Sequence, residues 1–181
     1  MFSAHTESVA MENNFAKFLA GTLEFQNSSI VKVRVGLKKV YELHFLAINL
    51  GRKCDSLMRN INYTKGREVG VDHFSFQLDS LNASVVNIQE KLKGHESEMN
   101  KYIEAFQRYN VKIEARITEE AATRPSVLMM NVRKKNEEFM SLSQNYLMTI
   151  QSSYHELNKA SALVDQIKNK ENISLRKRMC G

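Results

Sequence analysis

Residues 72–120 read DHFSFQLDSLNASVVNIQEKLKGHESEMNKYIEAFQRYNVKIEARITEE, and apolar side chains recur along them at alternating spacings of three and four residues. This spacing is typical of the a and d positions of a coiled coil. The positions are Phe74, Leu78, Leu81, Val85, Ile88, Leu92, His95, Met99, Tyr102, Phe106, Tyr109, Ile113 and Arg116. All except His95 and Arg116 are apolar or aromatic, and no proline interrupts them. A helix with such a seam needs partner helices along its length, because the seam would otherwise face water.

Residues 12–62 carry a similar spacing and are predicted to form the first helix. From Ile30 to Ile61 the apolar positions again follow one another at spacings of three and four residues. Further leucines widen this seam into a broad face: Leu43, Leu46, Leu50 and Leu57. A broad face suits a helix that touches two neighbours. Residues 31–37 alternate as a strand would, but the longer helical spacing runs through them and favours a helix.

Residues 125–172 are predicted to form the third helix, because Pro125 suits a first helical turn. The seam of this helix is Leu128, Val132, Phe139, Leu142, Tyr146, Ile150, Ser153, Leu157, Ala160, Val164 and Ile167. Two successive spacings of four residues, from Leu142 to Tyr146 and on to Ile150, form a stutter. The supercoil is expected to unwind locally at this stutter.

The connections between the three helices indicate the topology. Residues 62–71 contain two glycines and read as a loop, and Asp72 is the expected N-cap of the central helix. Pro125 disfavours helix at the residue before it, so the central helix should end near residue 121. Because short connections make sequential helices antiparallel neighbours, we predict an all-α fold: an elongated antiparallel three-helix coiled-coil bundle, up-down-up. This single bundle covers residues 12–172, and two chains could pair as a dimer along its broad faces.

The predicted helices leave a flexible N-terminal arm at residues 1–11 and a frayed basic tail at 173–181. One proline and seven glycines are too few for the many tight turns of an all-β or α/β chain. The chain has no apolar run of about 18 residues for a membrane span and no signal-peptide pattern. Cys54 and Cys180 are too far apart in the sequence to indicate a disulfide framework. We therefore predict a cytoplasmic protein in a reducing environment, and a nuclear location is also compatible.

Motifs for catalysis, cofactors and metals are missing from the sequence. The histidines lie too far from one another and from cysteine for a zinc site: His5, His44, His73, His95 and His155. Phosphate-cradling glycine loops and a Gly-x-Ser-x-Gly elbow are also missing. We therefore predict no catalytic residue, no cofactor, no metal and no small-molecule substrate. His95, in the seam, is interpreted as a neutral core histidine, with charging near pH 6 as the alternative.

The net charge of +6 is unevenly distributed. Lys and Arg outnumber Asp and Glu by ten to six in residues 1–70 and by nine to five in 126–181, whereas residues 71–125 hold seven against nine. In an up-down-up bundle, one end would gather a candidate anion- or partner-binding basic pole: Arg52, Lys53, Arg59, Lys65, Arg67, Lys168, Lys170, Arg176, Lys177 and Arg178. Such a cluster can attract phosphate groups. The alternative interpretation is a solvated face with weak ion pairs.

The sequence favours a non-catalytic interaction protein, either a rod-like adaptor or a small structural subunit of a larger assembly, with protein partners on its helical faces. The alternative is a phosphate-binding module that acts on an anionic membrane surface or on RNA through the basic pole. By architecture only, three long helices with Phe139, Tyr146 and Tyr154 on the third resemble the N-terminal regulatory domain of syntaxins. Three helices with basic surfaces likewise resemble the membrane-curving BAR dimers. These resemblances imply a membrane-associated role for the alternative.

Overall fold

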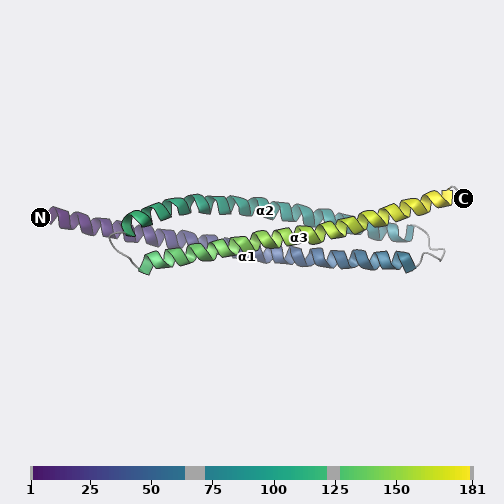
Figure 1. The fold of residues 1–181 in the computed structure, drawn as a ribbon, viewed down its shortest axis with the longest axis horizontal. Helices are drawn as coiled ribbons and strands as arrows, with labels where there is room; N and C mark the ends of the chain where they lie inside the picture. The colour runs from purple at the N-terminus through teal and green to yellow at the C-terminus, as the bar shows by residue number, and fades with distance from the viewer. Residues whose placement is uncertain (1, 64–71, 122–126, 180–181) are drawn as a thin grey trace. The chain divides into compact units, whose positions relative to one another are not determined.

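The computed structural model describes residues 2–63, 72–121 and 127–179, with side chains described for 14–63, 74–120 and 127–170. Three helices make up these residues: α1 (Phe2–Tyr63), α2 (Asp72–Ala121) and α3 (Val127–Met179) (Figure 1). The described residues include no strand, so the all-α class is confirmed and the packing is consistent with a helical bundle. Residues 31–37 are helical, and the strand alternative for them is wrong.

The observed helices extend beyond two of the bounds predicted from the sequence. α1 begins at Phe2, before the predicted start at residue 12, so the backbone of the predicted arm is helical from there. α3 continues to Met179, past the predicted end at residue 172. The two connections, residues 64–71 and 122–126, lie outside the described residues.

The contacts divide the chain into two compact units, where the sequence predicted one bundle. Unit 1 combines Met1–Leu37 with Ser97–Tyr146, and unit 2 combines Lys38–Glu96 with Leu147–Gly181. Each unit therefore contains a segment of each of the three helices.

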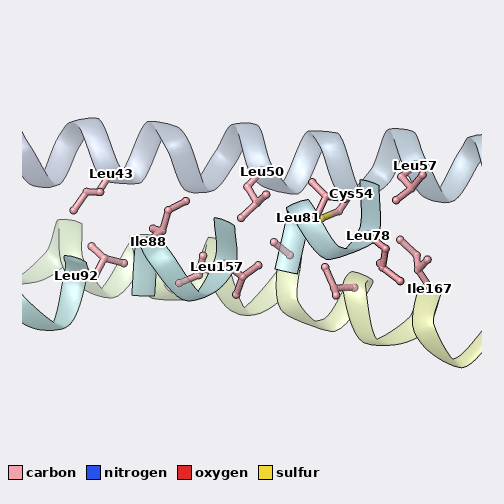
Figure 2. Close-up of a cluster of buried hydrophobic side chains, with 13 residues drawn as sticks. Leu43, Leu50, Cys54, Leu57, Leu78, Leu81, Ile88, Leu92, Leu157 and Ile167 are labelled. Atoms are coloured by element: carbon pink, nitrogen blue, oxygen red, sulfur yellow. The ribbon is translucent and has the colours of Figure 1, made fainter. Parts of the chain in front are cut away.

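The core of unit 2 is a cluster of aliphatic side chains from all three helices (Figure 2). Its buried members are Leu43, Leu50, Cys54, Leu57, Leu78, Leu81, Val85, Ile88, Leu92, Leu157, Ala160, Val164 and Ile167. Phe74 is partly buried against this cluster. Burying a leucine or isoleucine side chain stabilises a fold by about 1.5–3 kcal/mol, so this cluster accounts for the association of the three segments.

Unit 1 has a core built largely from aromatic rings. The ring centroid of Phe106 lies 3.6 Å from that of Phe139 and 5.9 Å from that of Phe25. Tyr109 also contacts Phe25, with 4.4 Å between ring centroids. Toward the other end of the unit, a second buried cluster contains Leu19, Ile113, Ile117, Met129 and Val132. Aromatic pairs contribute about 0.5–1.5 kcal/mol beyond the area they bury, so these rings join the three segments of unit 1.

Polar side chains are also buried in unit 1. The amide of Gln26, which is fully buried, donates a hydrogen bond to the carbonyl of Val132 at 3.0 Å. The remaining amide oxygen of Gln26 and the buried Oδ1 atoms of Asn110 and Asn136 have no hydrogen-bond partner among the described residues. Each unpaired buried polar atom costs about 1–3 kcal/mol, so this polar group lowers the stability of unit 1.

The heptad phase of the buried positions differs from the predicted phase in α2 and α3. In α2, Tyr102 is 37% exposed, and Ile103 and Ile117 are buried next to the predicted positions Tyr102 and Arg116. The buried positions of α2 here are Leu92, Met99, Ile103 and Phe106, so the phase shifts by one residue from the predicted one after Met99. In α3 the predicted stutter is wrong, because Ser143 is buried in place of Leu142 and the spacing stays regular through Tyr146. Isoleucine packs without exposing a polar group, whereas arginine and tyrosine keep polar tips in water.

Candidate functional site

Groups capable of metal or nucleophilic chemistry do not converge in the described part of the chain. Within it, no cluster of three His, Cys, Asp or Glu side chains could hold a metal ion. The free thiol of Cys54 is buried in the core of unit 2. Burial raises the pKa of this thiol, and the nearby charge of Asp55 raises it further. The thiol therefore stays protonated at neutral pH and is a poor nucleophile.

His44 links two helices of unit 2. Its Nδ1 atom lies 3.2 Å from the hydroxyl oxygen of Ser153. Ser153 donates its own hydrogen to the carbonyl of Thr149 at 2.7 Å, so the hydroxyl oxygen accepts from the histidine ring. This contact holds α1 against α3 and gives His44 a structural role. His95 is half-buried in α2.

Tyr154 and Glu96 form a second polar link in unit 2. The tyrosine hydroxyl donates to Oε2 of Glu96 at 3.1 Å. Burial, this hydrogen bond and the charge of Glu96 together raise the pKa of Tyr154 to about 12, from an ordinary value of 10.0. Because the pKa is raised in the folded state, the stabilisation is complete below pH 10 and is lost as the pH rises through about 12.

We therefore expect Tyr154 to ionise well above the ordinary pKa of a tyrosine in an alkaline absorbance titration. Tyr154→Phe should remove this late transition, and Glu96→Gln should move it to lower pH, because the charged acceptor is gone. Tyr63→Phe is the control, since the ring of Tyr63 is 73% exposed. If Tyr154→Phe removed an early transition instead, the hydrogen bond to Glu96 would be contradicted.

Five residues of the predicted basic pole have described side chains. Arg52, Lys53 and Arg59 are exposed on α1, and Lys168 and Lys170 are half-buried on α3. Lys170 donates to Oδ1 of Asn62 at 3.0 Å and contacts the sulfur of Met58 at 3.6 Å. In unit 2 the structure thus brings Lys170 beside the end of α1. Lys65 and Arg67 lie outside the described residues, as do the side chains of Arg176, Lys177 and Arg178.

Arg52 and Lys53 line two different grooves of unit 2. Lys53 lies on a groove of about 300 Å³ between α1 and α2, with Phe76 and Ser80 on its α2 side. Arg52 lies on a groove of about 560 Å³ between α1 and α3. These two neighbouring basic residues therefore line separate surfaces and do not line one shared anion pocket.

Two exposed aromatic side chains of unit 2 lie close together on α1. Tyr41 is 49% exposed and Phe45 is 61% exposed. They belong to a second heptad spacing on α1, which we call the outer stripe: Lys38, Tyr41, Phe45, Ile48, Arg52 and Asp55. Five of the six side chains are exposed, and Ile48 is half-buried. The outer stripe is a second helical face, separate from the one that packs in the core.

The groove between α1 and α3 adjoins the outer stripe. It is lined by three residues of the stripe, Ile48, Arg52 and Asp55. Gly51, Ala162 and Leu163 supply small and apolar parts of the lining, and Glu156, Lys159 and Gln166 supply its polar wall on α3. Aromatic residues are enriched at protein-binding surfaces, so the exposed rings of Tyr41 and Phe45 beside this groove mark a candidate binding surface.

Sequence reasoning missed the outer stripe, although its signal was present. The broad face was predicted from Leu43, Leu46, Leu50 and Leu57, of which only Leu46 is exposed, at 48%. Tyr41, Phe45 and Ile48 follow one another at spacings of four and three residues and form a separate stripe. The broad face predicted for α1 packs against both α2 and α3 in unit 2, and the outer stripe lies beside it.

Comparisons with protein-family models, with curated proteins and with solved structures give no match to this chain. In residues 2–63, 72–121 and 127–179, no helix has both the length and the apolar character needed to cross a membrane.

Proposed function

We propose that this chain is a non-catalytic interaction protein, an adaptor or small structural subunit that binds a protein partner through the outer stripe. The observation that carries this proposal is the exposure of Tyr41 and Phe45 on a helix whose opposite face is already packed. Aromatic residues are enriched at the centres of protein interfaces and contribute most of the binding energy there.

We also infer that the helices run up-down-up with coiled-coil packing. Contacts within unit 1 support this order. Along α1, Phe18 contacts Arg116, Phe25 contacts Phe106 and Lys32 contacts Tyr102, so the numbers on α2 fall as those on α1 rise. The partners on α3 rise instead, from Val132 for Gln26 to Glu138 for Arg34. This order is that of an antiparallel α2 and a parallel α3.

Affinity capture from the native cell tests the proposed function. We expect Phe45→Glu to lose the captured protein, because a charge would be placed in an apolar contact. The matched control is Phe76→Glu, which makes the same change at an 82% exposed phenylalanine of α2, outside the stripe.

Equal capture by both variants would contradict the outer stripe as the binding surface. If neither variant nor the wild type captured protein, and the chain bound anionic liposomes or RNA at low ionic strength, the alternative function through the basic residues would be favoured.

A further inference from the structure

We propose that the partner on the outer stripe is a second copy of this chain, with the two α1 helices antiparallel. The proposal rests on the proposed function, since it names the occupant of the same surface. Its basis is the order of side chains along the stripe, which is self-complementary when reversed. Self-complementarity is the requirement of a twofold symmetric interface, where each contact occurs twice.

The pairing is centred between Phe45 and Ile48. Reversing the stripe about this point places Phe45 opposite Ile48 of the second copy, and Tyr41 opposite Arg52. It also places Lys38 opposite Asp55. The centre is thus an apolar contact, flanked on each side by a cation–π pair and then by an ion pair.

The groove between α1 and α3 fits this pairing. Ile48 lines the groove, so the Phe45 ring of the second copy would lie at its mouth. Gly51 and Ala162 lack bulky side chains and leave space for a ring. A phenylalanine inserted there would bury surface that is otherwise 61% exposed. Aromatic anchors in small pockets are typical of binding hot spots.

The expected dimer is weak. The stripe from Lys38 to Asp55 spans about 26 Å of helix at 1.5 Å per residue. A single helix pair of this length is at the low end of specific interface sizes, so we expect a dissociation constant in the micromolar range. The same spacing next reaches Arg34 and Arg59 in the sequence, both basic, so this register adds no further ion pair of opposite charge. Favourable pairing therefore ends at Lys38 and Asp55.

Sedimentation of the full chain across a range of concentrations tests the dimer. We expect the wild-type mass to rise from monomer toward dimer between about 1 and about 100 µM, in line with a micromolar dissociation constant. Phe45→Glu should remain monomeric throughout, whereas Phe76→Glu should associate as the wild type does. A wild-type chain that stays monomeric over the whole range would overturn the proposal.

Two charge variants test the antiparallel register. In Lys38→Glu, residues 38 and 55 are both acidic, and in Asp55→Lys both are basic, so each variant alone should dimerise more weakly than the wild type. Mixed together, each chain supplies the charge that the other needs, and we expect heterodimers at a level near the wild-type dimer. Salt should reduce this rescue, because exposed ion pairs are screened.

The outcomes separate this inference from the proposed function. No rescue on mixing, with both variants folded by circular dichroism, would overturn the antiparallel register. A monomeric wild type that still captures another protein through Phe45 would overturn the second copy as occupant and leave the proposed function standing. Loss of capture and loss of self-association together in Phe45→Glu, with the endogenous chain as the captured protein, would support both.

Discussion

Replacing Phe106 by Asp should unfold unit 1. Phe106 is 1% exposed and its ring contacts both Phe25 and Phe139. The substitution removes a buried ring, which alone costs about 3–5 kcal/mol, and leaves a carboxylate without a partner. We therefore expect a loss of at least about 4 kcal/mol in the free energy of unfolding. Urea denaturation followed by far-UV circular dichroism would show a lost or strongly shifted transition.

Tyr102→Asp is the matched control for this change. Tyr102 is a predicted seam residue on the same helix, but it is 37% exposed, with Lys32 above its ring at 5.0 Å. A carboxylate there stays hydrated and lies near that lysine, so we expect a loss below about 1 kcal/mol. Equal destabilisation by Tyr102→Asp and Phe106→Asp would contradict the burial of Ile103. It would mean that Tyr102 is the seam residue, as predicted from the sequence.

Gly36→Leu should also destabilise unit 1 strongly. A Cβ atom on Gly36 would lie 2.8 Å from Cε of Met99 and 3.1 Å from Cε2 of Tyr146. The end of Met99 can move, but the Tyr146 ring is fully buried within the core of unit 1. Forcing extra atoms into a packed core costs about 1–3 kcal/mol, and a leucine adds four carbons here, so we expect about 3 kcal/mol.

Gly94→Leu provides the control for Gly36→Leu. Gly94 is exposed on α2, and no described side chain lies within 4 Å of the place where its Cβ would be. Leucine is a better helix former than glycine, so Gly94→Leu should raise the stability by about 0.5–1 kcal/mol. The denaturation midpoints of the two variants should therefore move in opposite directions. A rise in both would contradict the close approach of Tyr146 to Gly36.

The sequence predicted the helices well because their signals are local and long. Apolar residues spaced three and four apart over many turns, together with one proline and few glycines, favour long helices over any fold with many turns. Asp72, the predicted cap, is the first residue of α2. Pro125, the predicted break, lies between the end of α2 at Ala121 and the start of α3 at Val127. Residues 31–37 show the same rule, because the longer helical spacing outweighed a short strand-like alternation.

The phase of each seam was less predictable. Two pairs of neighbouring residues in α2 each offer two choices for the seam. Either Tyr102 or Ile103, and either Arg116 or Ile117, would fit a heptad spacing. Arg116 at a predicted seam position was a signal that the phase had shifted. The shift depends on which residues the other helices present, such as the rings of Phe25 and Phe139 against Phe106.

By itself, the sequence determined that this chain is helical, because helix formation depends on local spacing, helix-forming residues and the placement of proline and glycine. Only the tertiary structure decided which neighbouring residue is buried, why Gly36 must be small, and which face of α1 remains exposed. These features depend on contacts between residues far apart in the sequence, such as Gly36 with Tyr146. The outer stripe is exposed because the opposite face of α1 already packs against α2 and α3 in unit 2.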